Sequence, residues 1–129
     1  METPSDLDAV VRKLLKDLRT GIYSLIMLNI IKASGPIHGY ALRAKVMELS
    51  NNALTPSEST IYESLKYLEK RGLIKSFWGK AAGRGPPRKY YVITESGKEV
   101  LKVVNAEALT LAKLLQLAAK DDEEKELSH

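Results

Sequence analysis

The sequence of 129 residues contains no cysteine and two histidines, His38 and His129. Without thiols a chain can form neither a disulfide nor a thiolate metal site, and two histidines so far apart do not suggest a metal cluster. The sequence also lacks an apolar run of about 18 residues and a signal peptide. These absences predict a cytoplasmic protein with no cofactor, no metal and no membrane partner.

Enzyme signatures are missing as well. No nucleophile stands in a recognisable pattern with a base, and the glycines of residues 83–87 (GRGPP) lack the strand–loop–helix context of a nucleotide site. The sequence therefore predicts a protein that is not an enzyme.

Positive charge is present and unevenly placed. Residues 56–92 hold eight Lys/Arg against three Glu, whereas residues 121–126 hold five acids and one lysine. The formal net charge of +4 understates this contrast. A basic central segment favours a polyanionic partner.

The most informative stretch, residues 55–94, begins with a helix signal. Thr55 is expected to cap the helix, Pro56 suits its first turn, and Glu58 completes a capping box. The helix is expected to end near residues 71–72, where glycine can adopt a left-handed conformation.

One side of this helix is apolar, with Ile61, Leu65 and Leu68 in a stripe. The opposite side is polar or basic and could face a polyanion. An ordinary amphipathic surface helix is the alternative interpretation. The outward residues are Ser59, Glu63, Lys66 and Lys70, flanked by Thr60, Tyr62 and Tyr67.

The segment that follows decides between these interpretations. Residues 74–78 and 90–94 are rich in branched and aromatic residues and predict paired strands. The loop between them contains glycine and proline, and residues 70–89 contain no acid. Helix, strand, basic loop and strand in this order predict a winged helix-turn-helix. The basic residues are Lys70, Arg71, Lys75, Lys80, Arg84, Arg88 and Lys89.

Three further helices are expected before this stretch. An amphipathic helix ahead of Gly21 packs either on its own core or on a partner subunit, and Gly21 marks a break or a close contact. Residues 22–31 form a buried helix. A helix over residues 38–50 directs Leu42, Val46 and Leu49 inward. The stripe of the first helix includes Leu7, Val11, Leu14 and Leu18.

A long C-terminal helix is expected over residues 95–120, capped by Thr94 and tolerating Gly97 near its start. Its apolar residues follow heptad spacing, and its length exceeds what a small domain needs. We therefore expect it to pair with a second copy, the alternative being packing within the chain. The seam is Leu101, Val104, Ala108, Leu111, Leu115 and Ala118.

Several single residues have two interpretations. His38 follows Gly35-Pro36 and is expected to start a helix rather than bind a ligand. Tyr62 and Tyr67 either contact DNA or bury their rings. Phe77 and Trp78 are expected to pack into the core.

Three segments resemble the PadR-type transcriptional regulators, in particular short members with one C-terminal helix. The resemblance covers roughly residues 20–101 and rests on GPIHGYAL (35–42), LTPSESTIYESLKYLEKRGLI (54–74) and RKYYVITESG (88–97). It implies a homodimeric winged-helix DNA-binding protein, usually a repressor, whose C-terminal helix pairs with the partner. In many members a small aromatic or drug-like effector relieves repression.

The resemblance carries specific residues over and leaves two departures. Tyr62, Lys66 and Tyr40 fall on family positions of the recognition helix and the helix before it. Glu63 stands where many relatives have proline, and either accepts from a cytosine amino group or repels phosphates. The C-terminal helix has no tryptophan, so an indole-lined effector site does not carry over.

The predicted fold class is α+β, mostly α: a winged helix-turn-helix over residues 5–94 with a leading N-terminal helix, a dimerisation helix over 95–120, and a disordered tail over 121–129. The predicted function is operator recognition by a homodimer on palindromic double-stranded DNA. A winged-helix adaptor for an acidic protein is the alternative, which the basic wing disfavours. The predicted DNA-binding residues are Tyr40, Ser57, Ser59, Thr60, Tyr62, Glu63, Lys66, Lys80, Arg84, Arg88 and Lys89.

Overall fold

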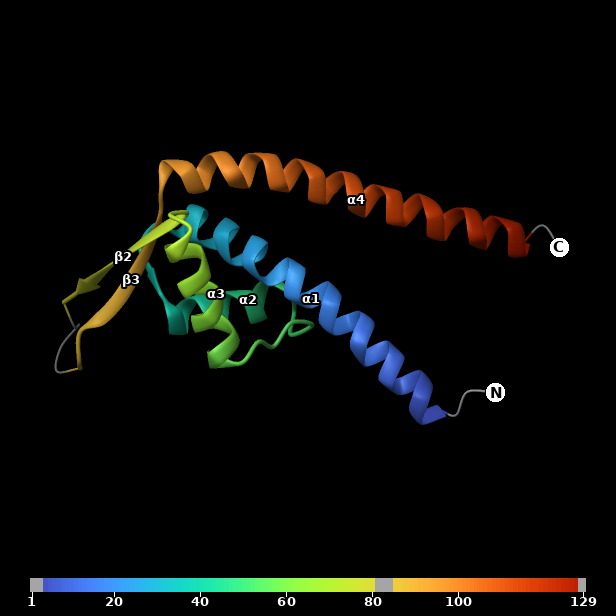
Figure 1. The fold of residues 1–129 in the computed structure, drawn as a ribbon, viewed down its shortest axis with the longest axis horizontal. Coiled ribbons are helices and arrows are strands. Elements are labelled where there is room, and N and C mark those ends of the chain that lie inside the picture. Colours follow the sequence, from blue (N-terminus) through green and yellow to red (C-terminus); the bar gives the residue numbers. More distant parts are fainter. Residues whose placement is uncertain (1–3, 81–84, 128–129) are drawn as a thin grey trace.

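The computed structural model describes residues 4–80 and 85–127, and this part of the chain forms four helices and a small three-stranded sheet that lies at one end of the molecule (Figure 1). The mostly helical α+β class is confirmed. The elements are α1 (Pro4–Ser34), β1 (Ile37–His38), α2 (Gly39–Leu49), α3 (Glu58–Lys70), β2 (Ile74–Gly79), β3 (Arg88–Ile93) and α4 (Glu95–Leu127).

The sheet is antiparallel, with β3 between β1 and β2. Tyr91 in β3 is opposite Ile37 on one side and Ser76 on the other. The hairpin of β2 and β3 extends away from the helices as a wing (Figure 1). Strand β1 was not predicted, because two residues are too short to show an alternating pattern.

The core lies where α1, α2, α3 and the start of α4 meet the sheet. Ile61, Leu65 and Leu68 of α3 are buried, as the stripe predicts. Leu42 and Val46 of α2 are also buried, and full burial of such a side chain contributes about 1.5–3 kcal/mol. The prediction for Leu49 is wrong: its side chain is 64% exposed, and it is the last residue of α2.

The start of α3 differs from the prediction in its capping residue. Ser57, not Thr55, is the N-cap, and its hydroxyl accepts from the backbone N–H of Thr60. Pro56 is buried ahead of the helix and its carbonyl accepts from Arg43 Nε at 2.6 Å. The end is as predicted, with Arg71 as C-cap and Gly72 at a positive φ of 76°.

Helix α1 is continuous through Gly21, so the predicted break is wrong. No close contact occurs there either, since an added Cβ would meet nothing within 4 Å. The two predicted helices are one element because glycine lowers helix stability by only about 1 kcal/mol. The buried residues Met27 and Ile31 in the second half anchor it.

Helix α4 begins as predicted and ends later. The Thr94 hydroxyl accepts from the Gly97 N–H at 3.0 Å and donates to the Gly72 carbonyl at 2.6 Å. The disordered tail predicted from residue 121 is wrong as far as Leu127, where the helix ends. Leu101, assigned to the dimer seam, lies in the chain's own core and is 1% exposed.

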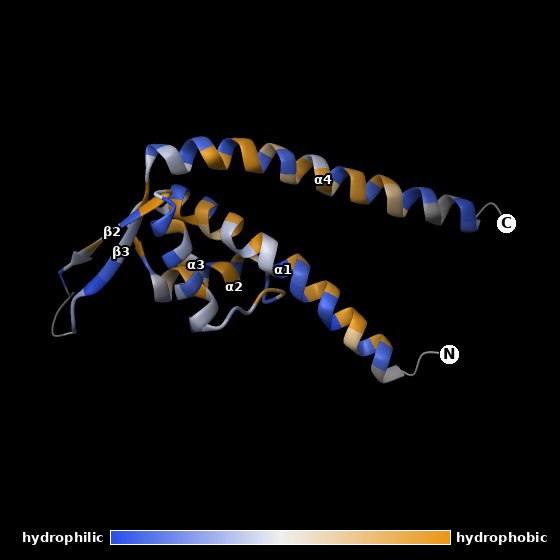
Figure 2. Ribbon diagram, in the orientation of Figure 1, coloured by the Kyte–Doolittle hydropathy of each residue, from blue (hydrophilic) through white to orange (hydrophobic). Residues whose placement is uncertain are grey.

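Beyond the core, α1 and α4 project in the same general direction and diverge, with apolar segments recurring along both (Figures 1 and 2). They are joined near the core by reciprocal amide hydrogen bonds of 2.9 Å between Asn29 and Asn105. No helix in the described residues meets the length and hydropathy needed to cross a bilayer. Most seam residues are exposed, namely Leu7, Val11, Leu14, Leu18, Val104, Leu111, Leu115 and Ala118, and Ala108 is half-buried.

Candidate nucleic-acid interface

Helix α3 presents the polar surface that its periodicity predicts. With its apolar stripe packed on the core, Ser59, Glu63 and Lys66 are exposed on the opposite side. Thr60 is half-buried, and its hydroxyl lies 3.0 Å from that of Ser57, so these two hydroxyls already satisfy one another. The solvent-exposed side of α3 therefore carries the Ser59 hydroxyl, the Glu63 carboxylate and the Lys66 ammonium group.

Tyr62 and Tyr67 are each partly packed and partly exposed. The Tyr62 ring packs against the first residue of α2, because a Cβ on Gly39 would lie 2.9 Å from that ring. Both tyrosines nevertheless remain about half exposed, at 51% and 52%. The Arg71 guanidinium lies 5.3 Å from the centre of the Tyr67 ring. Tyr62 is thus packed on one side, and both rings keep a solvent-exposed part.

The wing is linked to the helices by its cations. Arg88 Nη1 lies 2.9 Å from His38 Nε2, and Lys89 Nζ lies 3.9 Å from the Glu69 carboxylate of α3. Lys89 is half-buried and lies 6.0 Å from the centre of the Tyr91 ring. Lys80 and Arg88 are exposed, while Arg84 lies outside the described residues. These contacts fix the base of the wing relative to α3.

A hollow of about 620 Å³ opens between the wing and the helix-turn-helix. Tyr40, which is 71% exposed, stands on its rim together with Tyr62. The prediction that Phe77 and Trp78 are core residues is wrong, since they are 45% and 70% exposed. Strand β2 belongs to a hairpin that extends beyond the core, so its far end has no helix to cover it. The hollow is lined by His38, Gly39, Tyr40, Tyr62, Trp78, Pro87, Arg88, Lys89 and Tyr91.

His38 is a helix-start residue, as expected. It is the N-cap of α2, and its Nδ1 accepts from the Ala41 N–H at 3.2 Å. Burial, and then the nearby Arg88 guanidinium, lower the pKa of His38 below its usual value of 6.5. Burial and the neighbouring positive charge both disfavour the imidazolium form, so the neutral imidazole is favoured.

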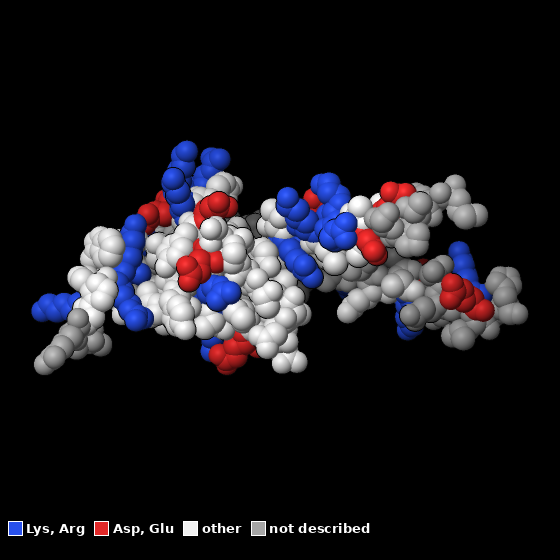
Figure 3. Space-filling view, turned by 90° about the horizontal axis from the view of Figure 1, so that it is seen from below, with Lys and Arg blue, Asp and Glu red and all other residues white. Residues whose placement is uncertain are grey.

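Charge on this surface is grouped rather than even. Figure 3 shows Lys and Arg side chains in separate groups over the winged core and over α1 where it leaves the core, with acidic side chains between them. No cluster of three potential metal ligands occurs among the described residues. Exposed cations, hydroxyls and aromatic edges are the groups that contact phosphates and bases in protein–DNA complexes.

The winged helix and its basic surface agree with a family match. Residues 27–103 match the family described as the transcriptional regulator PadR-like family. The chain belongs to this family. Its members are regulators of transcription rather than enzymes, and membership implies DNA-binding regulation.

Solved structures of PadR-like proteins share the fold over most of their length. A PadR family regulator from Eggerthella lenta is 29% identical, with a TM-score of 0.71 over 86% of this chain and 93% of that one. A PadR-like regulator from Bacillus cereus is 32% identical, with a TM-score of 0.62 over 78% and 97%. A protein called "Uncharacterized protein X" from Lysinibacillus sphaericus is 29% identical over 78% of this chain and 91% of its own length.

Some residues of this surface escaped the sequence analysis. Trp78 was assigned to the core, although its position next to the basic loop indicated the wing. Arg43 has no predicted role, yet it is half-buried and its Nε donates to the Pro56 carbonyl in the loop ahead of α3. The contact of His38 with Arg88 had no sequence signal, because the two residues are fifty positions apart.

Proposed function

We propose that the chain is a homodimeric repressor that binds a palindromic operator on double-stranded DNA in the cytoplasm. The observation that carries this proposal is the arrangement of α3 and the wing. An exposed polar helix face stands beside a hairpin whose cations are exposed or paired at its base. Family membership supports DNA as the partner.

In this proposal α3 enters the major groove and the wing lies along the backbone. Ser59, Glu63 and Lys66 are the residues best placed to read base edges. The remaining predicted residues position the protein by contacts to phosphate and sugar. They are Tyr40, Ser57, Thr60, Tyr62, Lys80, Arg84, Arg88 and Lys89.

The dimer is supported by the apolar surface of the projecting helices. Leu14, Leu18 and Leu115 are 63%, 64% and 69% exposed in the single chain. Contiguous exposed leucines mark protein interfaces. A second copy that covers them would place two α3 helices in successive major grooves, about 34 Å apart.

An effector that relieves repression rests on the family resemblance alone. A small aromatic or drug-like molecule is the proposed class. Tryptophan is absent from α4, so an effector here would have to be held by other side chains.

Replacing Arg88 by alanine tests the assignment of the wing. Affinity should fall for all duplexes alike, and the slope of log K against log salt should become shallower by about 0.9 for each phosphate that is no longer neutralised. Ser59→Ala is the matched comparison, because it should change the preferred sequence while keeping the slope. An unchanged slope in Arg88→Ala would remove the wing from the interface. Titration by fluorescence anisotropy at several salt concentrations measures both quantities.

A further inference from the structure

A second groove, of about 580 Å³, lies between the first half of α1 and the flank of α3 that faces away from the wing. From α1 it is lined by Arg12, Lys16 and Arg19, and from α3 by Thr60, Glu63 and Ser64. The sequence alone indicates no role for these three cations. The groove thus joins three positive charges and one carboxylate to the edge of the recognition helix.

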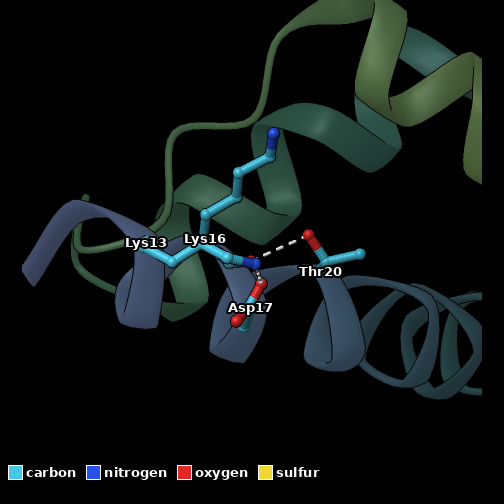
Figure 4. Close-up of polar contacts among 4 residues, drawn as sticks. All are labelled: Lys13, Lys16, Asp17 and Thr20. Carbon is cyan, nitrogen blue, oxygen red and sulfur yellow. Dashed lines mark hydrogen bonds and ion pairs between the residues drawn. The ribbon is translucent and has the colours of Figure 1, made fainter. Parts of the chain in front are cut away.

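The three cations of this groove are not used within the molecule. Among the described residues, no hydrogen bond or ion pair involves the side chains of Arg12, Lys16 or Arg19, and all three are exposed. Lys13 is different, because its Nζ lies 2.8 Å from the Asp17 carboxylate. Figure 4 shows Lys16 pointing away from that ion pair. Unpaired cations at a groove are free to bind an external anion.

The cations and the apolar stripe occupy different sides of α1. At 100° per residue, Arg12, Lys16 and Arg19 fall within one side of the helix, and Leu14 and Leu18 lie on another. A partner subunit that covers Leu14 and Leu18 would approach α1 from a different side than the three cations.

We propose that this groove holds the DNA backbone on the side of α3 opposite the wing. The inference rests on the proposed function: a helix in the major groove has a sugar–phosphate strand on each side. The wing cations lie on the Tyr62 and Glu69 flank of α3, and the α1 cations lie on the Thr60 and Ser64 flank. Recognition helix α3 thus lies between two phosphate-binding surfaces. One is the wing, and the other is the first half of α1, which also carries the apolar stripe.

Charge supports a phosphate rather than a base in this groove. Three cations against Glu63 leave a net positive charge, and guanidinium and ammonium groups bind phosphate oxygens well. Glu63 sits on the α3 side, so a phosphate should bind nearer α1. Contacts to phosphate carry no sequence information, so the groove should add affinity and register rather than specificity.

Lys16→Ala and Lys13→Ala form a matched pair to test this proposal. Each substitution removes one positive charge from α1, and the two positions lie within one helical turn of each other. Of these two lysines, only Lys16 lines the groove. The probe is a duplex selected by the wild-type protein from a random-sequence pool. Lys16→Ala should bind it roughly tenfold more weakly at 0.1 M salt, and its salt slope should be shallower by about 0.9 for each phosphate left without its cation. Lys13→Ala should match the wild type, and circular dichroism and light scattering should show both variants folded and in the same oligomeric state.

A second measurement locates the contact on the DNA. Duplexes with single neutral methylphosphonates are scanned along both strands, with wild type and with the triple variant R12A/K16A/R19A. We expect positions at which neutralisation weakens the wild type and leaves the triple variant unaffected. These positions should differ from those at which a methylphosphonate weakens binding by the wild type but not by Arg88→Ala.

Several outcomes would overturn the proposal. Equal reductions in affinity for Lys16→Ala and Lys13→Ala would show only a general charge effect. Binding of inorganic phosphate can be measured for the same variants. If Lys16→Ala binds DNA as the wild type does but no longer binds inorganic phosphate, the groove is a site for a small anion and not for DNA. If the wild type and Arg88→Ala both fail to bind duplexes at low salt, the proposed function itself is wrong. If the wild type binds DNA in a salt-dependent way and R12A/K16A/R19A binds with the same affinity and slope, the groove makes no DNA contact, while the proposed function stands.

Discussion

Gly97 stands where the first turn of α4 passes the turn between α3 and β2. A Cβ at this position would overlap the carbonyl oxygen of Leu73 and lie 2.7 Å from Ile93 Cγ1. Leu73 O also accepts from the Thr94 N–H at 3.0 Å, so its place is fixed. The sequence analysis treated this glycine as tolerated, whereas the packing requires it.

Alanine at Gly97 and alanine at Gly21 should therefore have opposite effects. Gly97→Ala should lower the free energy of unfolding by about 1–3 kcal/mol, because the backbone of Leu73 must move. Gly21→Ala should raise it by about 0.5–1 kcal/mol, since that position is mid-helix and open. Urea denaturation of both variants measures the difference. A Gly97→Ala protein as stable as the wild type would contradict the described contact.

His38 should make stability depend on pH near neutrality. Its pKa is lowered in the folded protein, so below pH 6.5 the unfolded chain takes up a proton that the folded chain resists. The free energy of unfolding should therefore fall as pH decreases from 6.5 toward the folded pKa, and it should be unaffected above about pH 7.5.

Asparagine at position 38 is the control for this dependence, because it can cap a helix without titrating. The difference in denaturation midpoint between wild type and His38→Asn should change between pH 7.5 and 5.5, with the wild type losing more as pH falls. A constant difference over this range would contradict the lowered pKa.

At the scale of the elements, a polar pair joins α1 and α4 beside the apolar core. The amides of Asn29 and Asn105 bond reciprocally, and Asn29 Nδ2 also donates to the Leu25 carbonyl. Both residues are half-buried where the two helices meet. A single polar pair in an apolar helix contact specifies register, because sliding would leave amides unsatisfied.

Replacing one or both asparagines by leucine tests this role. Each single variant should be less stable by about 1–3 kcal/mol, because it strands the other amide. The double variant should recover most of that stability, since no polar group is left unpaired. Thermal denaturation measures the coupling, and additive effects of the single variants would show that the two amides act independently.

Across the whole molecule, the two projecting helices carry leucine side chains that are largely exposed in the single chain. Leu111 is 56% exposed and Leu115 69% exposed on α4, and Leu18 is 64% exposed on α1. Helix α1 is thus apolar on one side and basic on another, since it carries both exposed leucines and the cations of the groove. Oligomeric state and DNA affinity should therefore be coupled.

A carboxylate in the seam should separate the subunits and abolish tight operator binding. Leu115→Glu should weaken the dimer by about 2 kcal/mol or more, because the charge would be desolvated at the interface. Light scattering should then show monomer at micromolar concentration, and operator affinity should fall in parallel. Lys113→Glu, on the opposite side of α4, is the control and should remain dimeric. A Leu115→Glu protein that stays dimeric would place the interface elsewhere.

Local sequence patterns determined the fold class, the apolar stripe and C-terminal end of α3, the wing strands and the caps at His38 and Thr94. These features depend on residues close together in the chain, where helical periodicity, glycine conformation and capping act directly. The motifs of residues 35–42, 54–74 and 88–97 also pointed to the family that residues 27–103 match.

Only the tertiary structure decided the features that depend on distant residues. The continuity of α1, the burial of Leu101, the exposure of Trp78 and the need for Gly97 are set by what lies beside each residue in space. The groove between Arg12, Lys16, Arg19 and α3 is of the same kind. Those cations look like an ordinary solvated helix face in the sequence, and packing alone places them beside the recognition helix.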